Sequence, residues 1–180
     1  MVHVNTLLNS ANVLAIDTSS TACILGLQVG GNVFTDIRGS GRSHSRDILP
    51  SISSLLEVSG LTFEQLDYIV FGEGPGSFTG LRIAVGVVQG LGYGLGIPVV
   101  PVCSLACLAQ SSYQKYGNEY NVVALHARQE EVYLGVYKIE KHTARSIMRE
   151  KVLDVNRIDF ELTGEWIGVG DGWIFREQLE

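Results

Sequence analysis

Charged residues are scarce in this chain. Asp, Glu, Lys and Arg make up 18% of its 180 residues, against 46% hydrophobic residues, so a folded chain has few charges to spread over its surface. This shortage predicts an apolar surface patch that meets a partner. The net charge of -6 argues against independent, tight binding to nucleic acid, because that binding requires a basic surface.

Cysteines are also few. The three of them, at positions 23, 103 and 107, form an odd set that argues against a disulfide framework. Cys103 and Cys107 lie four residues apart in an apolar run with no further Cys or His nearby. We therefore expect buried small side chains there, and neither a metal site nor a catalytic thiol.

The chain lacks a long uninterrupted apolar run. Its most apolar segment contains Arg82 and Gln89, which is not typical of a membrane span. Residues 1–12 lack the basic start and the long apolar core of a signal peptide, so we expect an N-terminal extension ahead of the first strand. A cytoplasmic location without a membrane partner is the resulting expectation.

Glycine, by contrast, is concentrated in one region. Residues 72–82 read GEGPGSFTGLR, between a strand-like run at 68–71 and an apolar helix that extends to residue 95. A strand, a glycine loop and a helix N-terminus can gather backbone N–H groups around an anion, which makes Gly74 and Gly76 candidate phosphate contacts. The loop is not a Walker phosphate loop, because no Gly-Lys-Ser/Thr follows.

The helix after this loop is costly to form. Each interior glycine costs about 1 kcal/mol relative to alanine. Gly86, Gly90 and Gly94 recur every four residues and so share one face. Such a flat stripe permits close approach of another backbone, either within the chain or from a second chain docked on this helix.

The hydrophobic pattern predicts a mixed α/β fold. Apolar and alternating runs bounded by Gly, Pro, Asn and Asp indicate strands, and apolar residues at helical spacing indicate helices. The order βββαβαβα is typical of a sheet covered by helices. Strands are predicted at 13–16, 22–29, 33–38, 68–71, 98–102 and between 121 and 155, and helices at 47–58, from 62, at 77–95 and at 104–116.

The first strand recurs later in the chain. VLAID at 13–17 and VVALH at 122–126 align at an offset of 109, and Gly26 then aligns with Gly135. A strand–turn–strand unit that recurs indicates two related lobes, which we place at 13–103 and 104–180. The first copy ends in a carboxylate and the second in a histidine.

Three features together resemble one family. They are the AIDTS strand end at 15–19, the duplicated lobe and the GPGSFTGLR loop at 74–82. They resemble the bacterial TsaB (YeaZ) family over about residues 13–173. The resemblance implies an α/β fold of the actin/sugar-kinase/Hsp70 (ASKHA) type with two ribonuclease-H-like lobes. Because members of the family continue beyond the GDGW segment at 170–173, the second lobe is expected to be incomplete.

The resemblance also implies a function. It is that of a noncatalytic partner in making threonylcarbamoyladenosine on tRNA, which supports the catalytic subunit TsaD together with the ATPase TsaE and reaches tRNA only through the assembled complex. In isolation, a homodimer is expected on the surface that TsaD would use. The expected docking residues are Ile52, Leu55, Leu56, Val85, Gly86, Val88 and Gln89.

No catalytic residue and no required cofactor are expected. Asp17 corresponds to the position that faces nucleotide phosphates in this superfamily, and the hydroxyls of Thr18 and Ser19 could bind phosphate or only cap their own turn. The second lobe has His126 where relatives usually have Asp, which weakens an ATP site and leaves weak nucleotide binding open. A glycoprotease-like peptidase and an ASKHA-type ATPase are the alternatives.

A metal site is not expected either. The catalytic relatives hold a metal through two histidines four residues apart, which face the same way on a helix. Here His44 is followed at that spacing by Ile48, and one histidine is not enough to hold the ion.

Overall fold

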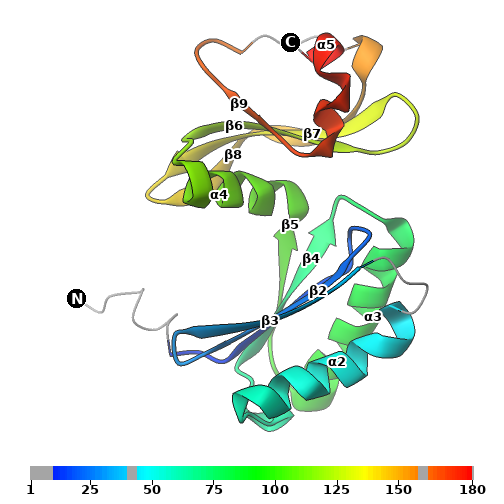
Figure 1. Ribbon diagram of the computed structural model, residues 1–180, viewed down its shortest axis with the longest axis vertical. Helices are drawn as coiled ribbons and strands as arrows, with labels where there is room; N and C mark the ends of the chain where they lie inside the picture. The colour runs from blue at the N-terminus through cyan, green and yellow to red at the C-terminus, as the bar shows by residue number, and fades with distance from the viewer. Residues whose placement is uncertain (1–9, 40–43, 158–161, 180) are drawn as a thin grey trace. The chain divides into compact units, whose positions relative to one another are not determined.

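The structure, a computed structural model, describes residues 10–39, 44–157 and 162–179, with the side chains of residues 44 and 45 also left undescribed (Figure 1). It divides into two compact units, Met1–Val102 and Cys103–Glu180. Residues 1–9 of the expected N-terminal extension lie outside the described part. Asn12 is tied to the first unit, since its backbone N–H donates to the Asp67 carboxylate at 2.7 Å.

The first unit is a five-stranded sheet in the order β3-β2-β1-β4-β5. Strand β1 pairs antiparallel with β2 and parallel with β4, while α2 and α3 lie on one face of the sheet (Figure 1). The elements are β1 (Val13–Asp17), β2 (Cys23–Val29), β3 (Asn32–Arg38), α2 (His44–Ser59), the 3-10 turn η1 (Phe63–Gln65), β4 (Tyr68–Gly74), α3 (Phe78–Leu95) and β5 (Val99–Cys103).

Alternation along the strands builds the core of this unit. Leu14 and Ile16 of β1 are buried, together with the apolar stripes of α2 and α3, which include Ile52 and Val88. Helix α3 begins and ends as expected, with Ser77 as N-cap and Gly96 in the left-handed conformation at its C-terminus.

One helix start was predicted wrongly. Helix α2 begins at His44, three residues before the expected cap at Asp47, and Pro50 therefore lies inside the helix. Asp47 contributes its charge to the first turn, where the helix dipole favours a carboxylate.

The second unit repeats the arrangement of the first. Its sheet has the order β8-β7-β6-β9, and β6 pairs antiparallel with β7 and parallel with β9, as β1 does with β2 and β4. The internal repeat is confirmed in topology. Its elements are α4 (Ser104–Tyr116), β6 (Tyr120–His126), β7 (Glu131–Glu140), β8 (Thr143–Asp154), η2 (Val155–Arg157), β9 (Ile167–Val169), η3 (Asp171–Phe175) and α5 (Arg176–Leu179).

The two copies differ in register by one residue. Ala15 pairs with Gly26 in the first sheet, whereas Gly135 pairs with Val123 rather than Ala124 in the second. The sequence alignment at an offset of 109 therefore matches the strands but not the partners across them.

Both faces of the second sheet are covered within its own unit. Leu105 and Ala109 of α4 pack with Val123, on one face. On the other face Trp173 packs with Val122 and donates its indole N–H to the Val122 carbonyl at 3.1 Å.

A buried tyrosine on β7 contacts a side chain of β8 and Cys103, the first residue of the second unit. The Tyr137 hydroxyl donates to Glu150 Oε1 at 2.7 Å and lies 3.6 Å from Cys103 Sγ. Burial is the main reason why the pKa of Tyr137 lies above its ordinary value. The hydrogen bond from Tyr137 is the main reason why the pKa of Glu150 lies below its ordinary value.

We expect Tyr137→Phe to raise the pKa of Glu150 and to destabilise the protein by about 1 kcal/mol at neutral pH, the typical net value of a hydrogen bond. Because the pKa of Glu150 is lowered by folding, its contribution to stability exists above its unfolded pKa and is lost as the pH falls through its folded pKa. Urea unfolding of the unmodified chain and of the Tyr137→Phe variant at several pH values measures this. The difference between their free energies of unfolding should become smaller as the pH falls.

The carboxyl resonance of Glu150 should shift its titration midpoint upward in the Tyr137→Phe variant. Glu150→Gln is the matched control, since it keeps an acceptor for Tyr137 and removes the titration. An unchanged Glu150 midpoint in Tyr137→Phe would contradict the assigned hydrogen bond.

Candidate functional site

Two backbone turns lock together where β1 and β4 end. The Thr18 hydroxyl donates to the Gly80 carbonyl at 2.7 Å, and the Ser77 N–H donates to the Ser19 carbonyl at 2.6 Å. The turn after β1 is therefore held to the Ser77 cap and the first turn of α3 by hydrogen bonds in both directions.

Glycine makes this contact sterically feasible. A Cβ at Gly76 would collide with the Ser19 carbonyl oxygen, and one at Gly80 would collide with the Thr18 carbonyl oxygen. At Gly72, a Cβ would lie 2.9 Å from the carboxylate carbon of Asp17. The glycine-rich loop is thus explained by backbone packing within the first unit.

The hydroxyl of Thr18 donates a hydrogen bond within the first unit. Thr18 is fully buried and its hydroxyl is used by Gly80, which corrects its assignment as a candidate phosphate contact. Asp17 Oδ1 accepts the Ser19 N–H at 2.7 Å, an Asx-type turn.

The remaining candidate phosphate residues lie at the same edge of the sheet. Gly74 is buried, and a Cβ there would lie 3.0 Å from a methyl carbon of Leu81; Gly76 is half-buried. A structural reason thus accounts for the place of each remaining candidate: Asp17, Ser19, Gly74 and Gly76. Nucleotide binding there remains a prediction.

The second lobe carries an acid that sequence reasoning missed. The His126 N–H at the end of β6 donates to Asp171 Oδ1 at 2.9 Å, and His126 Nε2 lies 2.9 Å from the Gln129 carbonyl oxygen. Asp171 is 45 positions away, so no local motif joined it to His126. Its carboxylate caps the strand end through a backbone N–H.

Among the described residues, no group of three or more His, Cys, Asp or Glu side chains is placed to hold a metal ion. The side chain of His44 lies outside them, so the expectation for His44 stays a prediction. The Ser77 hydroxyl accepts the Gly80 N–H at 3.2 Å as a helix N-cap.

Four of the expected docking residues belong to the core. The side chains of Ile52, Leu55, Leu56 and Val88 are at most 7% exposed, because they form the stripes of α2 and α3 that pack on the sheet. Their assignment to a contact surface is wrong. The apolar spacing marked the buried side of each helix.

The opposite side of α3 is open. Gly86 and Gln89 are exposed and Val85 is half-buried. A Cβ placed on Gly86, Gly90 or Gly94 would meet no atom within 4 Å.

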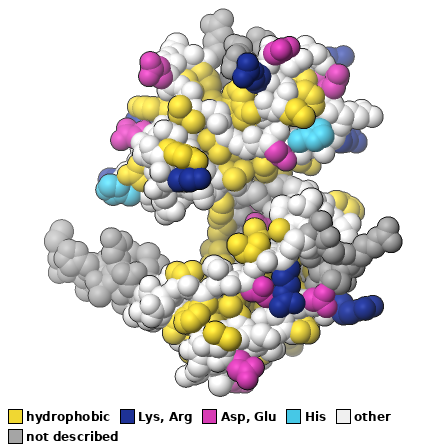
Figure 2. All heavy atoms as spheres, in the orientation of Figure 1, with side chains coloured by type: hydrophobic (Ala, Val, Ile, Leu, Met, Phe, Trp, Pro, Cys, Tyr) yellow, Lys and Arg dark blue, Asp and Glu magenta, His cyan; other side chains and the backbone are white. Residues whose placement is uncertain are grey.

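Aromatic side chains flank this glycine stripe. Phe78 is 71% exposed and Tyr93 is 94% exposed. The Arg82 guanidinium lies 3.2 Å from the Phe78 ring centroid, a cation–π contact. We call Phe78, Arg82, Gly86, Gln89, Gly90, Tyr93 and Gly94 the glycine face. Figure 2 shows hydrophobic side chains beside Lys, Arg, Asp and Glu side chains on the visible side of the first unit.

Two lobes of ribonuclease-H-like topology define an ASKHA-type protein, as expected. The family model described as TsaD: tRNA N6-adenosine threonylcarbamoyltransferase matches residues 38–165. Curated relatives and a solved structure are similar over most of the chain. The chain belongs to the TsaB (YeaZ) family.

The relatives show the extent of this similarity. The tRNA threonylcarbamoyladenosine biosynthesis proteins TsaB of Escherichia coli K12 and Haemophilus influenzae are 34% and 35% identical, over 89% and 96% of this chain and 71% and 77% of their own length. The structure of YeaZ from Pseudomonas aeruginosa is 39% identical, with a TM-score of 0.87 over 93% of this chain and 79% of that one. No helix within the described ranges has the length and apolar character to span a membrane.

A matched pair of substitutions compares a glycine that permits close backbone packing with a glycine that is exposed on α3. We expect Gly76→Ala to lower the free energy of unfolding by about 2 kcal/mol or more, because the new methyl collides with the Ser19 carbonyl. Gly86→Ala should raise it by up to about 1 kcal/mol, because its methyl enters open space on a helix.

Urea unfolding at a concentration where the chain is monomeric measures both values. A neutral Gly76→Ala would show that the two turns do not pack closely. A destabilising Gly86→Ala would show that the glycine face is covered in the free chain.

Proposed function

We propose that the chain is a noncatalytic partner in tRNA threonylcarbamoyladenosine biosynthesis and that it binds the catalytic subunit TsaD through the glycine face. The observation that supports this most is the open stripe of Gly86, Gly90 and Gly94, at which an added Cβ meets nothing. Family membership supports the pathway, and the stripe supports the choice of this surface.

The glycines of α3 differ in what offsets their cost to helix stability. Gly80 and Gly92 are explained inside the unit, since a Cβ at either would collide with the Thr18 carbonyl or with Val99. The three glycines of the stripe have no such partner, and each costs helix stability of about 1 kcal/mol. A partner helix that approaches the bare backbone closely would gain packing that side chains would prevent.

The chemistry of the face also suits a protein partner. It combines exposed aromatic rings with a single cation, Arg82, and aromatic and Arg residues are enriched at protein interfaces. A stable interface buries about 1,600 Å², so a partner would also have to cover exposed residues beyond the glycine face.

The proposed assembly has further parts. In the absence of TsaD, a second copy would cover the same face in a two-fold homodimer, because one self-complementary patch is enough. TsaE would join the assembled complex. With a net charge of -6, this chain would meet tRNA only through that complex, and it would need no cofactor of its own.

Gly90→Glu tests the docking surface. The substitution places a charged side chain in open space, so the free chain should keep its fold while the complex with TsaD weakens by about 100-fold or more, as for a charge buried at the centre of an interface. Calorimetric titration of TsaD with each variant measures this, and light scattering should show loss of the homodimer.

Val33→Glu is the matched control. Val33 is 67% exposed on β3, and the substitution adds the same charge away from α3. It should leave TsaD binding unchanged. If Gly90→Glu binds TsaD as well as the unmodified chain does, the glycine face is not the docking surface. If the unmodified chain neither binds TsaD nor supports tRNA modification by it, the proposed function fails.

A further inference from the structure

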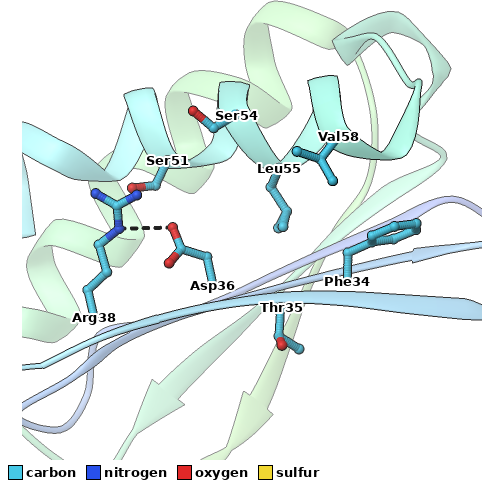
Figure 3. A pocket seen from close by; sticks show the side chains of 8 residues that line it. All are labelled: Phe34, Thr35, Asp36, Arg38, Ser51, Ser54, Leu55 and Val58. Carbon is cyan, nitrogen blue, oxygen red and sulfur yellow. Dashed lines mark hydrogen bonds and ion pairs between the residues drawn. The ribbon is translucent and has the colours of Figure 1, made fainter.

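A cavity of about 280 Å³ lies between β3 and α2 (Figure 3). This volume is near the lower end of the range of about 300–1,000 Å³ for small-molecule sites, so it suits a ligand the size of a small metabolite. The side chains that matter for its chemistry are Phe34, Asp36, Arg38, Ser51, Leu55 and Val58. None of them belongs to the glycine face or to the locked turns.

The cavity has a polar end and an apolar end. In Figure 3, Arg38, Asp36 and Ser51 lie together at one end, and the Phe34 ring and Val58 lie at the other, with Leu55 between them. A ligand that fills the space would need a polar head and an apolar tail.

Ser51 supplies the observation that points to a ligand. Ser51 is only 2% exposed, and its hydroxyl has no hydrogen-bond partner among the described residues. It lines the cavity at the polar end, beside the Arg38 guanidinium (Figure 3). A buried hydroxyl without a partner lowers folding stability, and a polar ligand atom in the cavity would remove that cost.

The charges at the polar end define the ligand further. Arg38 Nε lies 2.9 Å from Asp36 Oδ2, so this contact uses one edge of the guanidinium and one carboxylate oxygen. The terminal guanidinium N–H groups suit a ligand carboxylate, and the other Asp36 oxygen suits an ammonium. Because the two protein charges cancel, a neutral zwitterion matches this end better than a simple anion or cation.

We propose that this cavity binds a free apolar α-amino acid. Its carboxylate contacts Arg38 and the Ser51 hydroxyl, its ammonium contacts Asp36, and its side chain packs against Phe34, Leu55 and Val58. The proposal goes beyond the role in tRNA modification and does not depend on binding to TsaD.

The test uses L-leucine as the probe. Binding is detected by changes in the ¹H–¹⁵N chemical shifts of the full chain during titration. Saturable shifts are expected on β3 and α2. Isocaproate, which lacks the ammonium, and isopentylamine, which lacks the carboxylate, should each bind at least about tenfold more weakly, and glycine should also bind more weakly because it lacks the apolar tail.

Two variants locate the site. Arg38→Gln should weaken leucine binding at least about tenfold, while Arg145→Gln, an equal loss of charge on β8, should not change it. Ser51→Ala should weaken binding several-fold and yet raise the melting temperature of the free chain by about 2–4 °C, because it removes the unpartnered hydroxyl.

Several results would overturn the proposal. They are the absence of saturable shifts with L-leucine, binding of either singly charged analogue as tightly as L-leucine, and full affinity in Arg38→Gln. A lower melting temperature in Ser51→Ala would show that the hydroxyl already has a partner in the fold. Binding of both analogues as tightly as L-leucine would indicate a general apolar groove.

Discussion

The contact between two backbone turns at the ends of β1 and β4 is the constraint on which the first unit depends. Thr18 and Ser19 lie against Gly80 and Gly76, with hydrogen bonds running in both directions between the turns. The contact fixes where α3 begins, because the Ser77 cap is itself one of the bonded residues. From there the helix extends along the sheet, with Ala84 and Val88 in the core and its glycine stripe exposed.

Much of the fold could be predicted from the sequence because its signals are local. Apolar and alternating runs indicated β1 to β4, and the apolar, glycine-rich segment that extends to residue 95 indicated α3. The repeat of a strand ending at Asp17 and His126 indicated the two lobes. Strand β9 and the turns after it were not predicted. Strand β9 is three residues long, and its place in the sheet depends on pairing with β6, more than forty positions earlier.

The site was harder to predict, for a physical reason. Apolar residues at helical spacing can face either a core or a partner, and the sequence alone does not distinguish these environments. Val88 and Ile52 face the core. For the proposed docking surface, the sequence signal is the glycine pattern, because no neighbour in its own unit requires the glycines at 86, 90 and 94. The cavity at Ser51 had no such signal, since it arises from the packing of α2 on β3.

The exposed glycines of α3 also have a consequence for the lifetime of the chain. A helix with bare backbone on its solvent side exposes its hydrogen bonds to water and opens locally more easily than the sheet beneath it. Whatever covers that side stabilises the closed helix by mass action. Free and assembled copies would then differ in protease resistance, and the cell would clear the surplus of unassembled chain without any separate recognition signal.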